Sequence, residues 1–214
     1  MNTESSRKTS DISIALCGSA GQGVQTVEKL MTRIIKRAGF NVFATKEYMS
    51  RVRGGLNSTL IRIADHPVTS FIDRVDIFVP LSEGATGHLG GRISGKTVFL
   101  GEKKIFEDEI SDDNPVIDIP FTEIAEEIGG RVYSNTVAIG ALTGVLNIDP
   151  KEAARSLKQY FGDKDPEIVE KNIEALETGY QKAGESEGAS EIEFTLKPDQ
   201  DIRKQILVSG SDAV

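Results

Sequence analysis

Hydrophobic and polar positions along the chain follow two periods, one typical of strands and one typical of helices. Short apolar runs rich in β-branched residues predict strands at residues 12–17, 41–45, 58–64, 75–79, 97–100 and 116–119. Apolar residues spaced three and four apart predict helices at residues 27–38, 121–128, 136–146, 150–161 and 166–180. The first strand, glycine turn, helix and second strand form a βαβ unit, which predicts a parallel sheet. We therefore expect an α/β fold: a three-layer, open, mostly parallel, Rossmann-like sheet with extra C-terminal helices.

Three of the predicted helices begin with residues that can cap them. Asp149 and Asp165 each precede a proline, so their carboxylates are expected to cap the helices that follow. Ser134 and Asn135 are expected to cap the helix of residues 136–146. That helix is apolar on all sides and is therefore predicted to be buried.

Changes in composition divide the chain into four parts. Residues 1–10 are polar and are expected to be disordered, whereas residues 11–183 carry almost all the predicted elements and form one domain. Residues 184–205 are polar, mostly acidic and without periodicity, which predicts a linker or an extended arm. Residues 206–214 predict another strand and a glycine turn with no helix after them. We therefore expect them to open a following domain.

Composition and charge narrow the classes of function. The chain has 214 residues and a net charge of −8, and this acidic balance argues against general nucleic-acid binding. No apolar run approaches the roughly 18 residues of a membrane helix, and no secretory signal opens the chain, so we expect a cytoplasmic protein. The single cysteine, Cys17, excludes an internal disulfide and an iron–sulfur cluster held by this chain. Its place at the end of a buried strand predicts a core residue rather than a nucleophile.

A glycine-rich turn, GSAGQG at residues 18–23, joins the first strand to the first helix. Free backbone N–H groups and the positive end of the helix dipole make such a turn favourable for phosphate. The glycine spacing differs from both the dinucleotide-binding fingerprint and the Walker loop. A tight turn that binds no ligand is therefore the alternative interpretation.

Basic residues gather just after the second predicted strand. Lys46, Arg51 and Arg53 lie close together in a chain that is otherwise acidic. Guanidinium groups suit phosphate oxygens, and Gly54 with Gly55 allows a ligand to come close to the backbone. In a βαβ fold this loop and the glycine turn share one edge of the sheet, which predicts a ligand with several phosphates. The alternatives are a solvated basic loop or an arginine cluster that contacts an acidic partner subunit.

Three segments carry a family resemblance: GSAGQGVQT (18–26), YMSRVRGGLNSTLIRI (48–63) and SNTVAIGALTGVL (134–146). Together they resemble the gamma domain of 2-oxoacid:ferredoxin oxidoreductases over residues 11–183, and the Arg-Gly-Gly segment is the most specific part. The similarity is closest to the 2-oxoglutarate type, in which the gamma domain is fused ahead of the alpha subunit. Residues 206–214 resemble the opening of that alpha part.

The resemblance implies a role in the oxidative decarboxylation of a 2-oxoacid to an acyl-CoA, with electrons passed to ferredoxin. Coenzyme A would bind this domain, while thiamine diphosphate, Mg²⁺ and [4Fe–4S] clusters would lie on other domains or subunits. The partners would be the alpha and beta parts and, through the complex, ferredoxin, so this piece alone is expected to be inactive. No catalytic residue or metal ligand is assigned to it.

The residues expected to bind coenzyme A come from the two loops and from one helix start. The resemblance implies a phosphate cradle, contacts to the other phosphates and one helix-start amide: Gly18, Ser19, Gly21, Gln22, Gly23, Ser50, Arg51, Arg53, Gly54, Gly55 and Asn135. Lys46 is added because its ammonium group could serve a phosphate from the rim.

Two other functions stay open. A Rossmann-type dehydrogenase would place a pyrophosphate on residues 18–23 and use Glu47 for a ribose hydroxyl. The glycine spacing and the basic neighbours of Glu47 argue against it. A non-catalytic domain would serve only to hold the alpha and beta subunits together.

Overall fold

A computed structural model of the chain describes residues 10–48, 55–186 and 196–208. Its central layer is a six-stranded sheet in the order β2-β3-β1-β4-β5-β6. The strands are β1 (Asp11–Ser19), β2 (Asn41–Tyr48), β3 (Leu56–Ala64), β4 (Ile77–Pro80), β5 (Val98–Gly101) and β6 (Val116–Asp118).

One strand, β3, runs against the direction of the others. β1 pairs in parallel with β4, β4 with β5 and β5 with β6, whereas β3 is antiparallel to both β1 and β2. The predicted α/β fold with a mostly parallel sheet is therefore confirmed. β1 and β2 share a direction, as the βαβ unit requires, but they are not neighbours because β3 lies between them. As a result, the end of β2, the start of β3 and the end of β1 meet at one edge.

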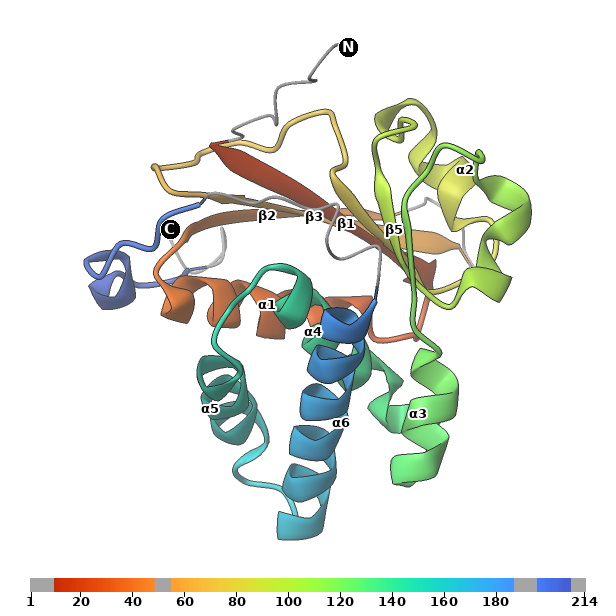
Figure 1. Cartoon of the computed structure of the whole chain (residues 1–214). Coiled ribbons are helices and arrows are strands. Elements are labelled where there is room, and N and C mark those ends of the chain that lie inside the picture. The colour runs from red at the N-terminus through yellow and green to blue at the C-terminus, as the bar shows by residue number, and fades with distance from the viewer. Residues whose placement is uncertain (1–9, 49–54, 187–195, 209–214) are drawn as a thin grey trace.

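Helices cover the two faces of the sheet unequally (Figure 1). One face carries α1 (Val24–Ala38) and α4 (Ser134–Val145), with α5 (Pro150–Phe161) and α6 (Pro166–Glu185) further out and α3 (Phe121–Ile128) beside them. The other face carries the short helix α2 (Ala85–Leu89), which the sequence analysis missed, and several single 3₁₀ turns. In the part of the chain that the structure describes, no helix is long and apolar enough to cross a membrane.

The side chains of β1 point alternately into two apolar cores, one on each face of the sheet. Ile14 and Leu16 point into the large core under the helices, while Ala15 and Cys17 point into a smaller core on the α2 face. The prediction that Cys17 is a core residue is confirmed, because its exposed fraction is 0%. Burial, together with the charge of Glu109, raises the pKa of its thiol to about 12, so the reactive thiolate does not form near neutral pH.

The helix starts confirm two predicted caps and correct a third. Asp149 accepts a hydrogen bond from the N–H of Lys151 at 2.9 Å, and Asp165 caps α6 in the same way. α4 instead begins at Ser134 without a side-chain cap, so the predicted cap by Ser134 and Asn135 is wrong. The Asn135 amide turns away from its own helix, toward the glycine turn.

Helices α4 and α6 pack so closely that glycine is required where they cross. A Cβ atom on Gly140 would lie 2.1 Å from the carbonyl oxygen of Leu176, and one on Gly179 would lie 2.1 Å from that of Val137. Real Cβ contacts do not come so close, so the two backbones touch directly. This packing fixes the start of α4, and with it the position of Asn135.

After α6 the chain returns to the C-terminal end of α1. Asp199 donates its N–H to the carbonyl oxygen of Gly39 at 2.7 Å, and Ile202 is buried. Residues 196–204 of the predicted arm therefore pack against the domain. Residues 206–208 lie in no strand and expose their side chains, contrary to the predicted strand. The rest of that predicted strand and turn, and the expected disordered N-terminus, lie outside the described residues.

Candidate functional site

The glycine turn between β1 and α1 presents free backbone donors. Gly21 and Gly23 have φ values of +91° and +76°, a region that residues with a side chain rarely adopt. Gly23 is the N-cap of α1 and offers no side chain to cap it. Among the described residues, no acceptor bonds the N–H groups of Gly23, Val24 and Gln25. These three donors lie at the positive end of the helix dipole and can receive an anion there.

Polar side chains hold this turn in one conformation. The amide oxygen of Gln22 accepts hydrogen bonds from the N–H of Ser19, at 2.9 Å, and from the hydroxyl of Ser82. The amide of Asn135 donates to the carbonyl oxygen of Gln22 at 2.9 Å. Gln22 and Asn135, predicted as ligand contacts, thus also position the turn. Ser82 was not predicted, and its place just after β4 at the same edge was the one signal for it.

The glycine turn contacts the end of the basic loop. Ala20 donates its N–H to the carbonyl oxygen of Gly55 at 3.1 Å, and Ser19 pairs with Leu56 across the two strands. The predicted approach of the two loops is therefore present. Ser50, Arg51, Arg53 and Gly54 lie outside the described residues, and their contacts stay a prediction.

A cavity of about 290 Å³ opens beside the turn, and we call it the β2-side cavity. It brings the glycine turn and Lys46 together, and its lining is Ser19, Gly21, Gly23, Val24, Gln25, Thr26, Lys46, Tyr48, Asn57, Ser58 and Thr59. The ammonium of Lys46 lies 2.9 Å from the Glu28 carboxylate. That contact raises the pKa of Lys46 and keeps it protonated, although Glu28 already neutralises part of its charge.

Glu47 belongs to the other face of the sheet. Its carboxylate accepts a hydrogen bond from Arg92 at 2.8 Å, which lowers the pKa of Glu47. Adjacent residues of a strand point to opposite faces, so Glu47 points away from the cavity that Lys46 lines. The dehydrogenase interpretation needed Glu47 beside the glycine turn, and the structure removes that possibility.

A second, larger cavity lies on the other side of the glycine turn, and we call it the α3-side cavity. It has a volume of about 460 Å³, and its lining is Gly21, Gln22, Gly23, Pro80, Leu81, Glu102, Ile105, Phe121, Thr122, Arg131, Val132, Ser134 and Asn135. Burial alone would raise the pKa of Glu102, but hydrogen bonds from Thr122 and Lys104 outweigh it and lower that pKa. The Glu102 carboxylate is therefore ionised, but it forms an ion pair with Lys104 at 3.0 Å, and Arg131 also lines the cavity. Among the described residues, no cluster of three His, Cys, Asp or Glu side chains could hold a metal ion.

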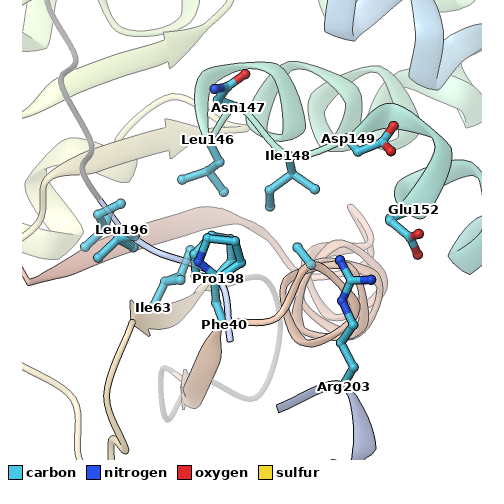
Figure 2. Close-up of a pocket in the computed structure, with 12 residues that line it drawn as sticks. Phe40, Ile63, Leu146, Asn147, Ile148, Asp149, Glu152, Leu196, Pro198 and Arg203 are labelled. Carbon is cyan, nitrogen blue, oxygen red and sulfur yellow. The ribbon is translucent and has the colours of Figure 1, made fainter. Parts of the chain in front are cut away.

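A third cavity, the opposite-edge cavity, lies away from this site at the other end of the strands. It has a volume of about 300 Å³. Figure 2 shows Phe40, Ile63, Leu146, Ile148 and Leu196 around it. None of the predicted site residues lines it.

Fold and site together define an α/β domain with free backbone N–H donors at the carboxyl edge of its sheet, where an anion could be received. Comparison with protein families is more specific: the chain belongs to the pyruvate ferredoxin/flavodoxin oxidoreductase family, whose model matches residues 13–182. The family resemblance seen in the sequence is thereby confirmed.

Known relatives are subunits of such enzymes. The chain is 32% identical over 178 residues to the 2-oxoglutarate synthase subunit KorC of Methanocaldococcus jannaschii, covering 80% of this chain and 94% of that protein. It is 24% identical over 190 residues to KorC of Archaeoglobus fulgidus, covering 88% of this chain and 96% of that protein.

Solved structures share the fold. A 2-oxoglutarate:ferredoxin oxidoreductase from Magnetococcus marinus, with 2-oxoglutarate, coenzyme A and succinyl-CoA bound, matches with a TM-score of 0.81 and 24% identity. The match covers 91% of this chain and 34% of that one, so the chain spans about a third of that protein's length. The pyruvate oxidoreductase subunit PORC of Thermotoga maritima matches with a TM-score of 0.67 and 22% identity, over 81% of this chain and 97% of that one.

Proposed function

We propose that the chain is the gamma-type component of a 2-oxoacid:ferredoxin oxidoreductase, of the 2-oxoglutarate type, and that it binds coenzyme A. Membership of the family and the similarity to KorC subunits support this assignment. The observation that carries the coenzyme A role is the meeting of the glycine turn, Lys46 and Gly55 at one edge of the sheet.

Charge explains why coenzyme A needs this edge. The ligand carries roughly four negative charges near neutral pH, and the protein has a net charge of −8. The free N–H groups of residues 23–25 and the ammonium of Lys46 supply local positive potential. Arg51 and Arg53, which follow β2 in sequence, are assigned to the remaining phosphates.

The rest of the reaction belongs to other components. We assign thiamine diphosphate, Mg²⁺ and [4Fe–4S] clusters to the alpha and beta parts, and electron delivery to ferredoxin through the complex. The complete enzyme would convert a 2-oxoacid and the thiol of coenzyme A to an acyl-CoA and CO₂, with two electrons leaving for ferredoxin. We place it in the cytoplasm, and we expect the chain by itself to show no oxidoreductase turnover.

Calorimetric titration of the chain with coenzyme A and with NADH tests the ligand. We expect coenzyme A to bind and NADH not to bind, and the opposite result would refute the proposal. The double variant Arg51→Ala/Arg53→Ala should weaken coenzyme A binding at least ten-fold. Lys158→Ala/Lys182→Ala removes the same charge from α5 and α6 and should change the affinity less than two-fold.

Kinetic measurements on the assembled enzyme distinguish a role in coenzyme A binding from a purely structural role. If the chain only holds subunits together, the Arg51→Ala/Arg53→Ala variant will leave the KM for coenzyme A unchanged while the subunits dissociate. We expect the KM for coenzyme A to rise while the complex stays intact on a sizing column.

A further inference from the structure

The wall of the β2-side cavity depends on contacts behind it, on the face of the sheet that carries α2. β2 stands at one edge of the described sheet, so the strand ladder holds it from the β3 side alone. Near its end, Glu47 forms a cross-strand pair with Ser58 of β3. The two flanking pairs line the β2-side cavity on the opposite face: Lys46 with Thr59, and Tyr48 with Asn57. Contacts that fix Glu47 therefore also fix this wall.

Arg92 binds Glu47 from outside the strand ladder. Its Nη1 donates to the Glu47 carboxylate at 2.8 Å, and its Nε donates to the Asp73 carboxylate at 2.8 Å. The guanidinium group also lies over the Phe71 ring, 5.9 Å from the ring centre. These three contacts hold the planar guanidinium in one orientation, and one of them reaches the end of β2.

A second contact to this strand pair comes from α2 itself. The buried Ser58 hydroxyl donates to the Glu47 carboxylate at 3.4 Å, and Nε2 of His88 lies 3.3 Å from the hydroxyl oxygen. Because the one hydroxyl hydrogen is directed to Glu47, His88 is the donor to Ser58. Ala85 and Leu89 are buried in the smaller core and anchor α2 there. The network that ends on Glu47 therefore starts from a packed helix.

Resting on the proposed function, we propose that Arg92 is a positioning residue for coenzyme A binding. Arg92 does not line the β2-side cavity and acts through Glu47, on the opposite face of β2. By holding the end of β2, it places the ammonium of Lys46 and the hydroxyl of Tyr48 in the cavity wall. The Tyr48 hydroxyl accepts a hydrogen bond from the amide of Gln25 at 3.2 Å, so the same wall is joined to α1 beside the glycine turn.

Two substitutions of opposite charge separate positioning from a direct effect of charge. Coenzyme A is anionic, so charge alone would weaken its binding when Arg92 is removed and strengthen it when Glu47 is removed. Positioning predicts weaker binding in both cases, because either change breaks the same contact. In calorimetric titrations, we expect Arg92→Ala and Glu47→Ala each to weaken coenzyme A binding about five-fold or more. In the double variant, the second substitution should add less than a further two-fold change.

Arg74 provides a matched control at the opposite end of β1 from the glycine turn. It also bridges two carboxylates, those of Asp11 at 2.6 Å and Asp76 at 2.9 Å. Arg74→Ala should therefore lower the thermal stability as Arg92→Ala does, yet change coenzyme A affinity less than two-fold. Arg92→Lys keeps the charge but loses the fork that joins Glu47 to Asp73, and should weaken binding two- to five-fold. This variant gives an answer even if Arg92→Ala fails to fold.

Kinetics of the assembled enzyme give a second readout. Arg92→Ala should raise the KM for coenzyme A about five-fold or more and leave kcat and the KM for the 2-oxoacid within two-fold. The proposal is overturned if Glu47→Ala tightens coenzyme A binding or leaves it unchanged, or if Arg74→Ala weakens it as much as Arg92→Ala does. Those results leave the proposed function intact, whereas failure of coenzyme A to bind the wild-type chain overturns both.

Discussion

Replacing Gly23 with alanine perturbs both the backbone of the turn and its contact with α4. At a φ of +76°, alanine costs about 1–2 kcal/mol relative to an unstrained position. Its Cβ would lie 2.3 Å from the amide nitrogen of Asn135, so that amide must move away and lose its hydrogen bond to Gln22. Such a bond contributes about 0.5–1.5 kcal/mol. We therefore expect Gly23→Ala to lower the free energy of unfolding by about 1.5–3.5 kcal/mol.

Gly21 provides the matched control, because it has a φ of +91° and no neighbour within 4 Å of an added Cβ. Gly21→Ala should therefore cost the strain alone, about 1–2 kcal/mol. In a background of Asn135→Ala, the hydrogen bond is already gone, and Gly23→Ala should cost no more than Gly21→Ala does.

Equilibrium urea unfolding, followed by circular dichroism, gives the four free energies of this cycle. The loss in the Gly23→Ala/Asn135→Ala variant should fall short of the sum of the single losses by about 0.5–1.5 kcal/mol. Additive losses, within about 0.3 kcal/mol, would show that Gly23 and Asn135 are not in contact and would refute this description of the turn.

Three further predictions concern the packing of α4 against α6, the loss of stability at low pH and the binding of coenzyme A. Gly179→Ala should destabilise the protein by about 2–4 kcal/mol because its Cβ would lie 2.1 Å from an α4 carbonyl oxygen. Gly184 lies in the same helix with open space around it, so Gly184→Ala should stabilise the protein by up to about 1 kcal/mol. Thermal melts of the two variants measure both effects. Burial raises the pKa of Asp11, but hydrogen bonds from Arg74 and Arg62 outweigh that effect and lower the pKa. The ionised Asp11 therefore stabilises the folded protein fully at pH values above the ordinary pKa of an aspartate, and this stabilisation is lost as the pH falls through the lowered pKa. Unfolding measured from pH 6 to pH 2 should therefore show a shallower acid loss in Asp11→Asn than in the wild type. Coenzyme A affinity should fall as salt rises, with a smaller slope in Arg51→Ala/Arg53→Ala, and a slope that the variant does not change would contradict the phosphate role of the arginines.

The pattern of apolar residues predicted the elements better than it predicted their pairing. The periodicity that predicted a helix at residues 27–38 corresponds to α1 (Val24–Ala38). Nothing in a local pattern says which strands pair, so the insertion of β3 between β1 and β2 was not foreseen. Helix α2 was missed because a five-residue, glycine-flanked segment is too short to show a helical period.

The candidate site was predictable only where its residues follow local sequence patterns. Glycines after the first strand and basic residues after the second predict that both segments lie at the same edge of the sheet. The structure brings the glycine turn, Lys46 and Gly55 together at that edge. The hydrogen bond between Ser82 and Gln22 joins residues 60 apart in sequence and leaves no local trace.

Glu47 could have been excluded earlier from the sequence. It follows Lys46 directly, and neighbours in a strand point to opposite faces. The predicted strand stopped at residue 45, whereas β2 runs to Tyr48, and that boundary concealed the alternation.

A crystal structure of the chain soaked with coenzyme A tests the central claim most directly. We predict density for the phosphates within hydrogen-bond distance of the N–H groups of residues 23–25 and near the ammonium of Lys46. Density for the nucleotide end away from the glycine turn, for example in the opposite-edge cavity beside Phe40 and Leu146, would contradict it.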